Sequence, residues 1–192
     1  MAGLSKLEAV NLMLSNIGEV PVSSLTGAAG DVYVTTAETV LDEVSRAIQA
    51  QGWEFNTDKN YTVVPDIDSQ VVITSNIITM DTMPGGIDVT VRQGKLYNKT
   101  AHTFLFTDNL TCEVLWEFDY EDLPQYVRHY VAVRAARILS NRLQGDVTGS
   151  QLTVDDEREA KATANRHDMR NSDRTMFDSD HYGIGRLKTR RM

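Results

Sequence analysis

The chain has 192 residues, of which 41% are hydrophobic and 24% are charged. This length is enough for one folded core with or without an appendage. The sequence has neither an apolar run long enough to span a membrane nor the pattern of a secretory signal. Its single cysteine, Cys112, excludes an internal disulfide and a cysteine-rich zinc site, so we expect folding in a reducing cytoplasm. The net charge of −8 argues against a sequence-specific DNA reader, because DNA affinity depends on neutralising phosphates.

A first helix is expected over residues 5–17. Residues 5–8 form a capping-box pattern, and the apolar residues that follow recur at helical spacing. Gly18 stands where a left-handed residue closes a helix, and Pro21 requires an extended chain before it. Residues 27–30 are a flexible connection without the lysine and Ser/Thr ending of a phosphate loop.

An apolar face at helical spacing predicts a second helix that ends at Gly52. Asp42 and Arg46 are spaced to pair on its exposed side. Trp53 and Phe55 then alternate with polar residues, which indicates a strand beginning after Gly52, and Trp53 is expected to pack back onto the helices.

Residues 53–119 have the pattern of an antiparallel sheet, because short apolar runs separated by turn residues leave no room for crossover helices. Residues 76–82 fit a strand or a loop. The predicted strands are 61–64, 70–73, 89–92, 104–106 and 111–118, and the predicted turns are 83–86, 93–94 and 107–109.

A third, arginine-rich helix is expected to begin after Pro124 and to stop at Gly145. Residues 153–156 open a fourth helix, whose acidic first turn suits the helix dipole and whose few apolar residues are mostly alanines. We expect that helix to be packed by small residues or left exposed. Residues 171–192 show little core and indicate a polar arm.

The predicted fold is therefore α+β: a four-helix bundle built from N- and C-terminal segments, with an inserted, mainly antiparallel β region and a C-terminal arm. The predicted domains are 1–52 with 120–170, then 53–119, and the arm 171–192. Gly18, Pro21, Gly52, Trp53 and Phe55 are the expected anchors of this fold.

Motifs for catalysis, metals and cofactors are missing from the sequence. The four histidines have no metal-ligand spacing, and Cys112 reads as a buried or half-buried thiol in a strand. Residues 117–122 carry enough acids to bind a cation, although a solvated connection from strand to helix explains them too. We predict no catalytic, cofactor-binding or metal-binding residues and no enzyme activity.

Several short segments, in order along the chain, resemble tail tubular protein A of short-tailed bacteriophages of the T7 type. They cover most of the chain at a similar total length. These segments are Ile17-Gly18-Glu19, Pro21-Val22, Gln51-Gly52-Trp53, Phe55-Asn56, Pro65-Asp66, Tyr120, Leu123-Pro124 and Ala135-Ala136-Arg137.

This resemblance implies a head-to-tail adaptor, or gatekeeper, in the virion tail, assembled in the host cytoplasm. Twelve copies would form a ring beneath the portal protein, hold the tubular nozzle (tail tubular protein B) with tail fibres nearby, and let genomic DNA pass without sequence-specific binding. We expect the second and third helices to build the subunit contacts. The basic end of the arm, with Arg186, Lys188, Arg190 and Arg191, is expected to contact the portal.

Two other functions stay open at this stage. Carboxylates of the β region, such as Glu113 and Glu117, could serve a glycan or peptidoglycan hydrolase that acts during DNA delivery. The basic C-terminal residues could also belong to a host-side DNA-binding factor.

Overall fold

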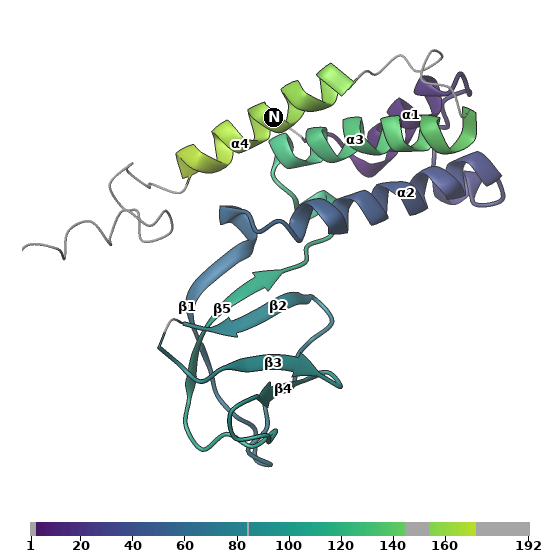
Figure 1. The fold of residues 1–192 in the computed structure, drawn as a ribbon. Coiled ribbons are helices and arrows are strands. Elements are labelled where there is room, and N and C mark those ends of the chain that lie inside the picture. Colours follow the sequence, from purple (N-terminus) through teal and green to yellow (C-terminus); the bar gives the residue numbers. More distant parts are fainter. Residues whose placement is uncertain (1–2, 84, 145–153, 172–192) are drawn as a thin grey trace, which may run out of the picture.

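The computed structural model describes residues 3–83, 85–144 and 154–171. The helices are α1 (Lys6–Asn16), α2 (Val32–Gln49), α3 (Gln125–Gln144) and α4 (Val154–Asn171). The strands are β1 (Thr57–Val63), β2 (Ile77–Thr82), β3 (Val89–Arg92), β4 (Lys95–Asn98) and β5 (Leu110–Trp116). The helices pack together and the β region projects from one side of them, which confirms the predicted α+β fold (Figure 1). In the described part of the chain, no helix is long and apolar enough to cross a membrane.

Residues next to α1 satisfy the free backbone groups at both of its ends, so this helix forms where the sequence predicts. The Ser5 hydroxyl accepts a hydrogen bond from the Glu8 amide (3.2 Å), and the Glu8 carboxylate accepts one from the Ser5 amide (2.7 Å). At the other end, Gly18 adopts a φ of +83°. The Glu19 amide can then donate to the Leu14 carbonyl (2.9 Å), which ends the helix.

The chain passes from α2 into the sheet through a helical turn, so the predicted strand at Trp53 is wrong. Gly52 has a φ of +74°, and a single 3-10 turn spans Glu54–Asn56 before β1 begins. The Asn56 side chain accepts a hydrogen bond from the Trp53 amide (2.9 Å) and closes this turn. The rings of Trp53 and Phe55 both turn back toward the helices. Their spacing of two residues therefore resembles the period of a strand although the segment is a helical turn.

One cluster of buried residues joins all four helices. α1, α2 and α3 contribute large aliphatic and aromatic side chains to it, whereas α4 contributes only Ala160 and Ala164. Met169, the largest apolar residue predicted on α4, is 73% exposed. α4 is thus packed by small residues, and its attachment depends more on polar contacts than that of the other helices does.

The sheet has the order β1-β5-β2, with both outer strands antiparallel to β5, and β3 and β4 form a separate antiparallel pair. The antiparallel prediction is confirmed, and the ambiguous residues 76–82 contain β2. A second buried cluster lies within this region and includes Met80, Leu96, Phe106 and Val114. The β region therefore has a core of its own.

Two predicted strands, 70–73 and 104–106, do not form. Val72 makes only an isolated bridge with Lys95, and residues 104–106 belong to no strand. A tight turn accounts for residues 70–73, because the Asp66 carboxylate accepts hydrogen bonds from two following amides and Ser69 adopts a φ of +59°. The chain is bent by local side-chain bonding before a longer strand can pair.

β4 was not predicted, because its four residues include only two apolar ones, Leu96 and Tyr97, and so give too short a pattern. It pairs with β3 through a two-residue turn in which Gln93 has a φ of +53° and Gly94 a φ of +70°. Two positive φ values at the centre of a hairpin turn match the twist of the adjoining strands.

The predicted helix stop at Gly145 lies outside the described residues. α4 includes Asn171, the residue at which the predicted arm begins.

Candidate assembly surfaces

Two buried amide side chains hold both chain crossings between the bundle and the β region. Gln49 is 1% exposed; its Oε1 accepts a hydrogen bond from the Phe118 amide (2.8 Å) and its Nε2 donates to the Phe118 carbonyl (3.0 Å). Asn56, also 1% exposed, donates from Nδ2 to the carbonyls of Gln49 (3.1 Å) and Trp116 (2.9 Å). The outgoing and returning segments are thus bonded to the same two residues, which fixes the β region on the bundle.

An aromatic group covers this crossing. The Trp53 indole Nε1 donates to the Ile48 carbonyl at 2.7 Å, and its ring lies 6.4 Å from that of Tyr130 on α3. Phe55 lies between Trp53 and Phe118, with ring centroids 6.5 and 6.4 Å away. Such tilted pairs stabilise an interface beyond their buried area.

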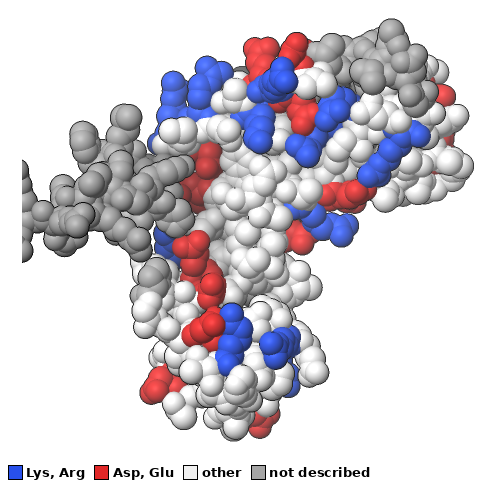
Figure 2. Space-filling view, viewed as in Figure 1, with Lys and Arg blue, Asp and Glu red and all other residues white. Residues whose placement is uncertain are grey.

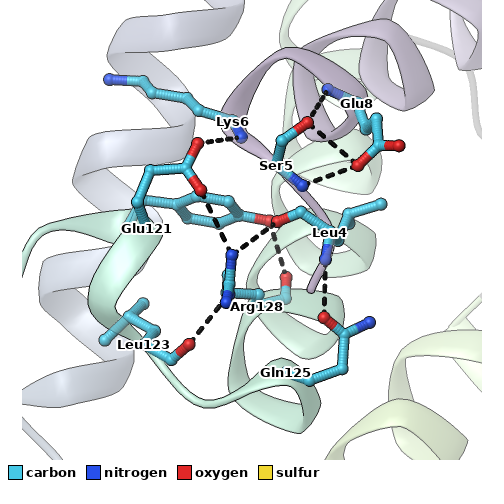
Figure 3. A network of polar contacts seen from close by, with 9 residues as sticks. Leu4, Ser5, Lys6, Glu8, Glu121, Leu123, Gln125 and Arg128 are labelled. Carbon is cyan, nitrogen blue, oxygen red and sulfur yellow. Dashed lines mark hydrogen bonds and ion pairs between the residues drawn. The ribbon is translucent and has the colours of Figure 1, made fainter. Parts of the chain in front are cut away.

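Arg128 on α3 anchors the start of the chain (Figure 3). Its guanidinium contacts the Glu121 carboxylate at 3.2 Å, and the other oxygen of Glu121 accepts a hydrogen bond from the Lys6 amide at 2.7 Å. Gln125 accepts one from the Leu4 amide at 2.6 Å. The first residues of α1 are therefore tied to the segment that opens α3.

The arginines of α3 are paired within the chain, so they do not form a free basic stripe. Their partners lie on α2, on α4 and on the segment before α3, and Glu157 of α4, 13% exposed, serves two of them. The pairs are Arg128–Glu121, Arg134–Glu157, Arg137–Glu157 and Arg142–Glu43. Figure 2 shows cationic and acidic side chains interspersed over the helices on the face in view.

The C-terminal end of α4 contacts α3 and the turn at Glu54, close to where the chain passes from the bundle into the β region. The Asp168 carboxylate accepts a hydrogen bond from the Glu54 amide (3.1 Å), and burial raises the pKa of that carboxyl. The His167 ring stacks on Tyr126 with centroids 5.2 Å apart, and Asn171 donates to the Tyr126 hydroxyl (3.2 Å). These polar contacts compensate for the small apolar contribution of α4.

A polar cleft of about 330 Å³ lies between α2 and residues 117–121. These residues belong to the acidic segment that the sequence predicts to be either a cation site or a solvated connection from strand to helix. Asp42 binds Lys6 at 2.9 Å and Arg46 binds Glu117 at 3.5 Å, so the pair predicted between Asp42 and Arg46 is replaced by two longer-range pairs. No cluster of three or more potential metal ligands occurs among the described residues.

The two carboxylates considered for a hydrolase do not share a cleft. Glu117 lines the polar cleft and binds Arg46, whereas Glu113 lines a second cleft on the face of the sheet. The histidines are dispersed as well: His102 lies in a turn, His129 is exposed on α3, and His181 lies outside the described residues.

The remaining titratable groups of note are structural. Cys112 is fully buried in β5, and burial together with the nearby Asp81 charge raises the pKa of its thiol. Tyr120 is buried, donates to the Arg128 carbonyl at 3.1 Å, and has a pKa raised by burial.

The other expected site residues fall in two places. Pro21 lies in the exposed link between α1 and α2. The Asn11 side chain forms two hydrogen bonds with the backbone of the adjacent Val22 and so holds this link against α1. The sequence did not indicate this contact. The residues expected to contact the portal, Arg186, Lys188, Arg190 and Arg191, lie outside the described residues.

Comparison with known proteins identifies the family of the chain. The family model described as tail tubular protein matches residues 7–174. Tail tubular protein A of Klebsiella phage KP34 is 25% identical over 169 residues, which cover 88% of this chain and 89% of that protein. The chain thus belongs to the tail tubular protein A family, a family of structural proteins of bacteriophage tails.

Proposed function

We propose that this protein is a ring-forming head-to-tail adaptor that joins the portal to the tail nozzle and extends the channel for DNA ejection. The observation that carries this proposal is the fixed crossing at Gln49 and Asn56. It gives every subunit two different units, a helical bundle and a β region, in one relative orientation. A connector between two unlike rings needs a subunit with two unlike, rigidly related ends.

The ring itself requires contacts between different surfaces of neighbouring subunits, and twelve such contacts close the proposed ring. α2 begins and α3 ends at the end of the bundle away from the β region (Figure 1). Val32 and Tyr33 on α2 and Leu143 on α3 are large apolar residues left exposed there. Contacts between subunits would cover them.

The charges suit a channel that DNA passes without being held. The net charge is −8, and the α3 arginines already bind carboxylates of the same chain. Few cations of the described helices are left to neutralise phosphates, so tight DNA binding is not expected.

The basic C-terminal residues are proposed to contact the portal protein, while tail tubular protein B and the tail fibres bind the opposite end of the ring. The test removes residues 172–192, which follow α4, and compares that variant with a full chain in which Arg186, Lys188, Arg190 and Arg191 are all changed to Gln. Both should keep the circular dichroism of the wild type and fail to cosediment with portal rings.

Wild-type cosedimentation by both variants would refute the portal contact. Loss of binding in the truncated chain alone would also refute the role of the four cations, because it would assign attachment to other residues of the arm.

A further inference from the structure

One face of the β1-β5-β2 sheet packs on the second buried cluster, and the opposite face carries two facing carboxylates. Met80 and Val114 are register partners on the buried face. The next pair, Asp81 of β2 and Glu113 of β5, is also directly opposed and therefore points to the other face. Like charges directly opposite in a sheet destabilise it.

These two carboxylates line a cleft of about 250 Å³ on that face, together with Gly52, Thr57 and Thr79. Within the described part of the chain, no lysine, arginine or histidine lines this cleft, and neither carboxylate has a cation within salt-bridge distance. Acids of the helical part, such as Glu43 and Glu157, are paired. The cleft is thus a place where a cationic ligand would relieve the repulsion between facing charges.

We propose that this cleft binds a basic peptide segment, and that its occupant in the free subunit is the C-terminal segment 185–192 of the same chain. That segment has four cations and no acid. Its basic, apolar and polar residues suit a cleft that is lined by Leu115, by threonines and by the two carboxylates. Charge complementarity between the two is therefore direct.

The position of α4 makes binding within one chain favourable. Asp168, near the end of α4, is bonded to Glu54, two residues beyond the Gly52 that lines the cleft. Residues 172–184 span up to about 3.3 Å each when extended, so segment 185–192 can reach the cleft from Asn171. A short tether raises the effective concentration of a ligand, which allows weak ionic contacts to hold it.

The proposal concerns the subunit before assembly and does not depend on the adaptor role. Its test uses a fluorescent peptide with the sequence of residues 185–192 and measures fluorescence anisotropy at low salt. The protein is the full chain in which Arg186, Lys188, Arg190 and Arg191 are changed to Gln, so that the cleft is free. The peptide should bind this protein.

Adding Asp81→Asn and Glu113→Gln should weaken binding roughly tenfold, as expected for the loss of a few exposed ion pairs. Adding Glu159→Gln, a change of an exposed acid on α4, should leave binding unchanged. The wild-type chain should bind the added peptide more weakly than the chain with the neutralised segment, because its own segment occupies the cleft. Thermal unfolding by circular dichroism verifies that each variant is folded.

Three results would overturn the proposal. They are equal peptide binding with and without the two carboxylates, equal binding by the wild-type chain and the neutralised chain, and no binding at all. If the wild type forms dimers that the peptide dissociates, the segment binds a neighbouring copy, and the claim of binding within one chain is wrong. None of these readouts involves the portal, so they are separable from a failure of the adaptor proposal.

Discussion

Replacing Gln49 by Leu tests whether the crossing is fixed as described. Leucine nearly preserves the volume but removes the bonds to the amide and carbonyl of Phe118. A buried backbone group without a partner costs about 1–3 kcal/mol. Phe118 is partly exposed, so water offsets some of this loss. We expect a loss of about 2–4 kcal/mol in the free energy of unfolding and a fall in melting temperature of roughly 5–15 °C.

Urea unfolding followed by circular dichroism measures this loss. The matched control is Gln51→Leu, because Gln51 is exposed and its side chain makes only a 3.4 Å bond to the Ala47 carbonyl. That change should alter stability by less than about 0.5 kcal/mol. Equal effects of the two substitutions would refute the reasoning, since the buried amide would then contribute no more than a surface one.

Glu157→Gln should destabilise the protein by about 1–3 kcal/mol, because two arginines lose a largely buried partner, and should speed hydrogen exchange in α4. Glu159→Gln on the exposed side of α4 should do neither. Burial raises the pKa of Asp168, so the folded state binds a proton at higher pH than the unfolded state does. As the pH falls from neutral to about 4, the free energy of unfolding of the wild type should thus rise relative to that of Asp168→Asn. A difference between the two proteins that does not change with pH would contradict this. Cys112, fully buried with a raised pKa, should react with a thiol reagent only at the rate of unfolding, and rapid native labelling would show an open sheet.

The parts of the fold that the sequence predicted depend on residues close together in the chain. The Ser5–Glu8 capping box and the glycine after α1 act within a few residues, so their effects could be stated before the structure was known. The apolar faces of α2 and α3 likewise follow from spacing alone. The hairpin of β3 and β4 could have been predicted too, because Gln93-Gly94 is a two-residue turn, but only two apolar residues follow it and the second strand was missed.

The features that the sequence did not reveal join distant residues. Gln49 and Phe118 are 69 positions apart, and a glutamine at the end of an apolar helix face gives no sign that it binds a backbone so far along the chain. The facing of Asp81 and Glu113 depends on the register of two strands, which only the paired sheet determines. The strand predicted at 70–73 failed for the opposite reason, since a local turn at Asp66 outweighed its β propensity.

Light scattering of purified portal rings, with and without this protein, tests the central claim most directly. The account predicts that a saturated portal ring gains the mass of twelve copies of the 21.5 kDa chain, in a single discrete complex. An unchanged portal mass, or a gradual increase without a defined endpoint, would contradict a closed adaptor ring.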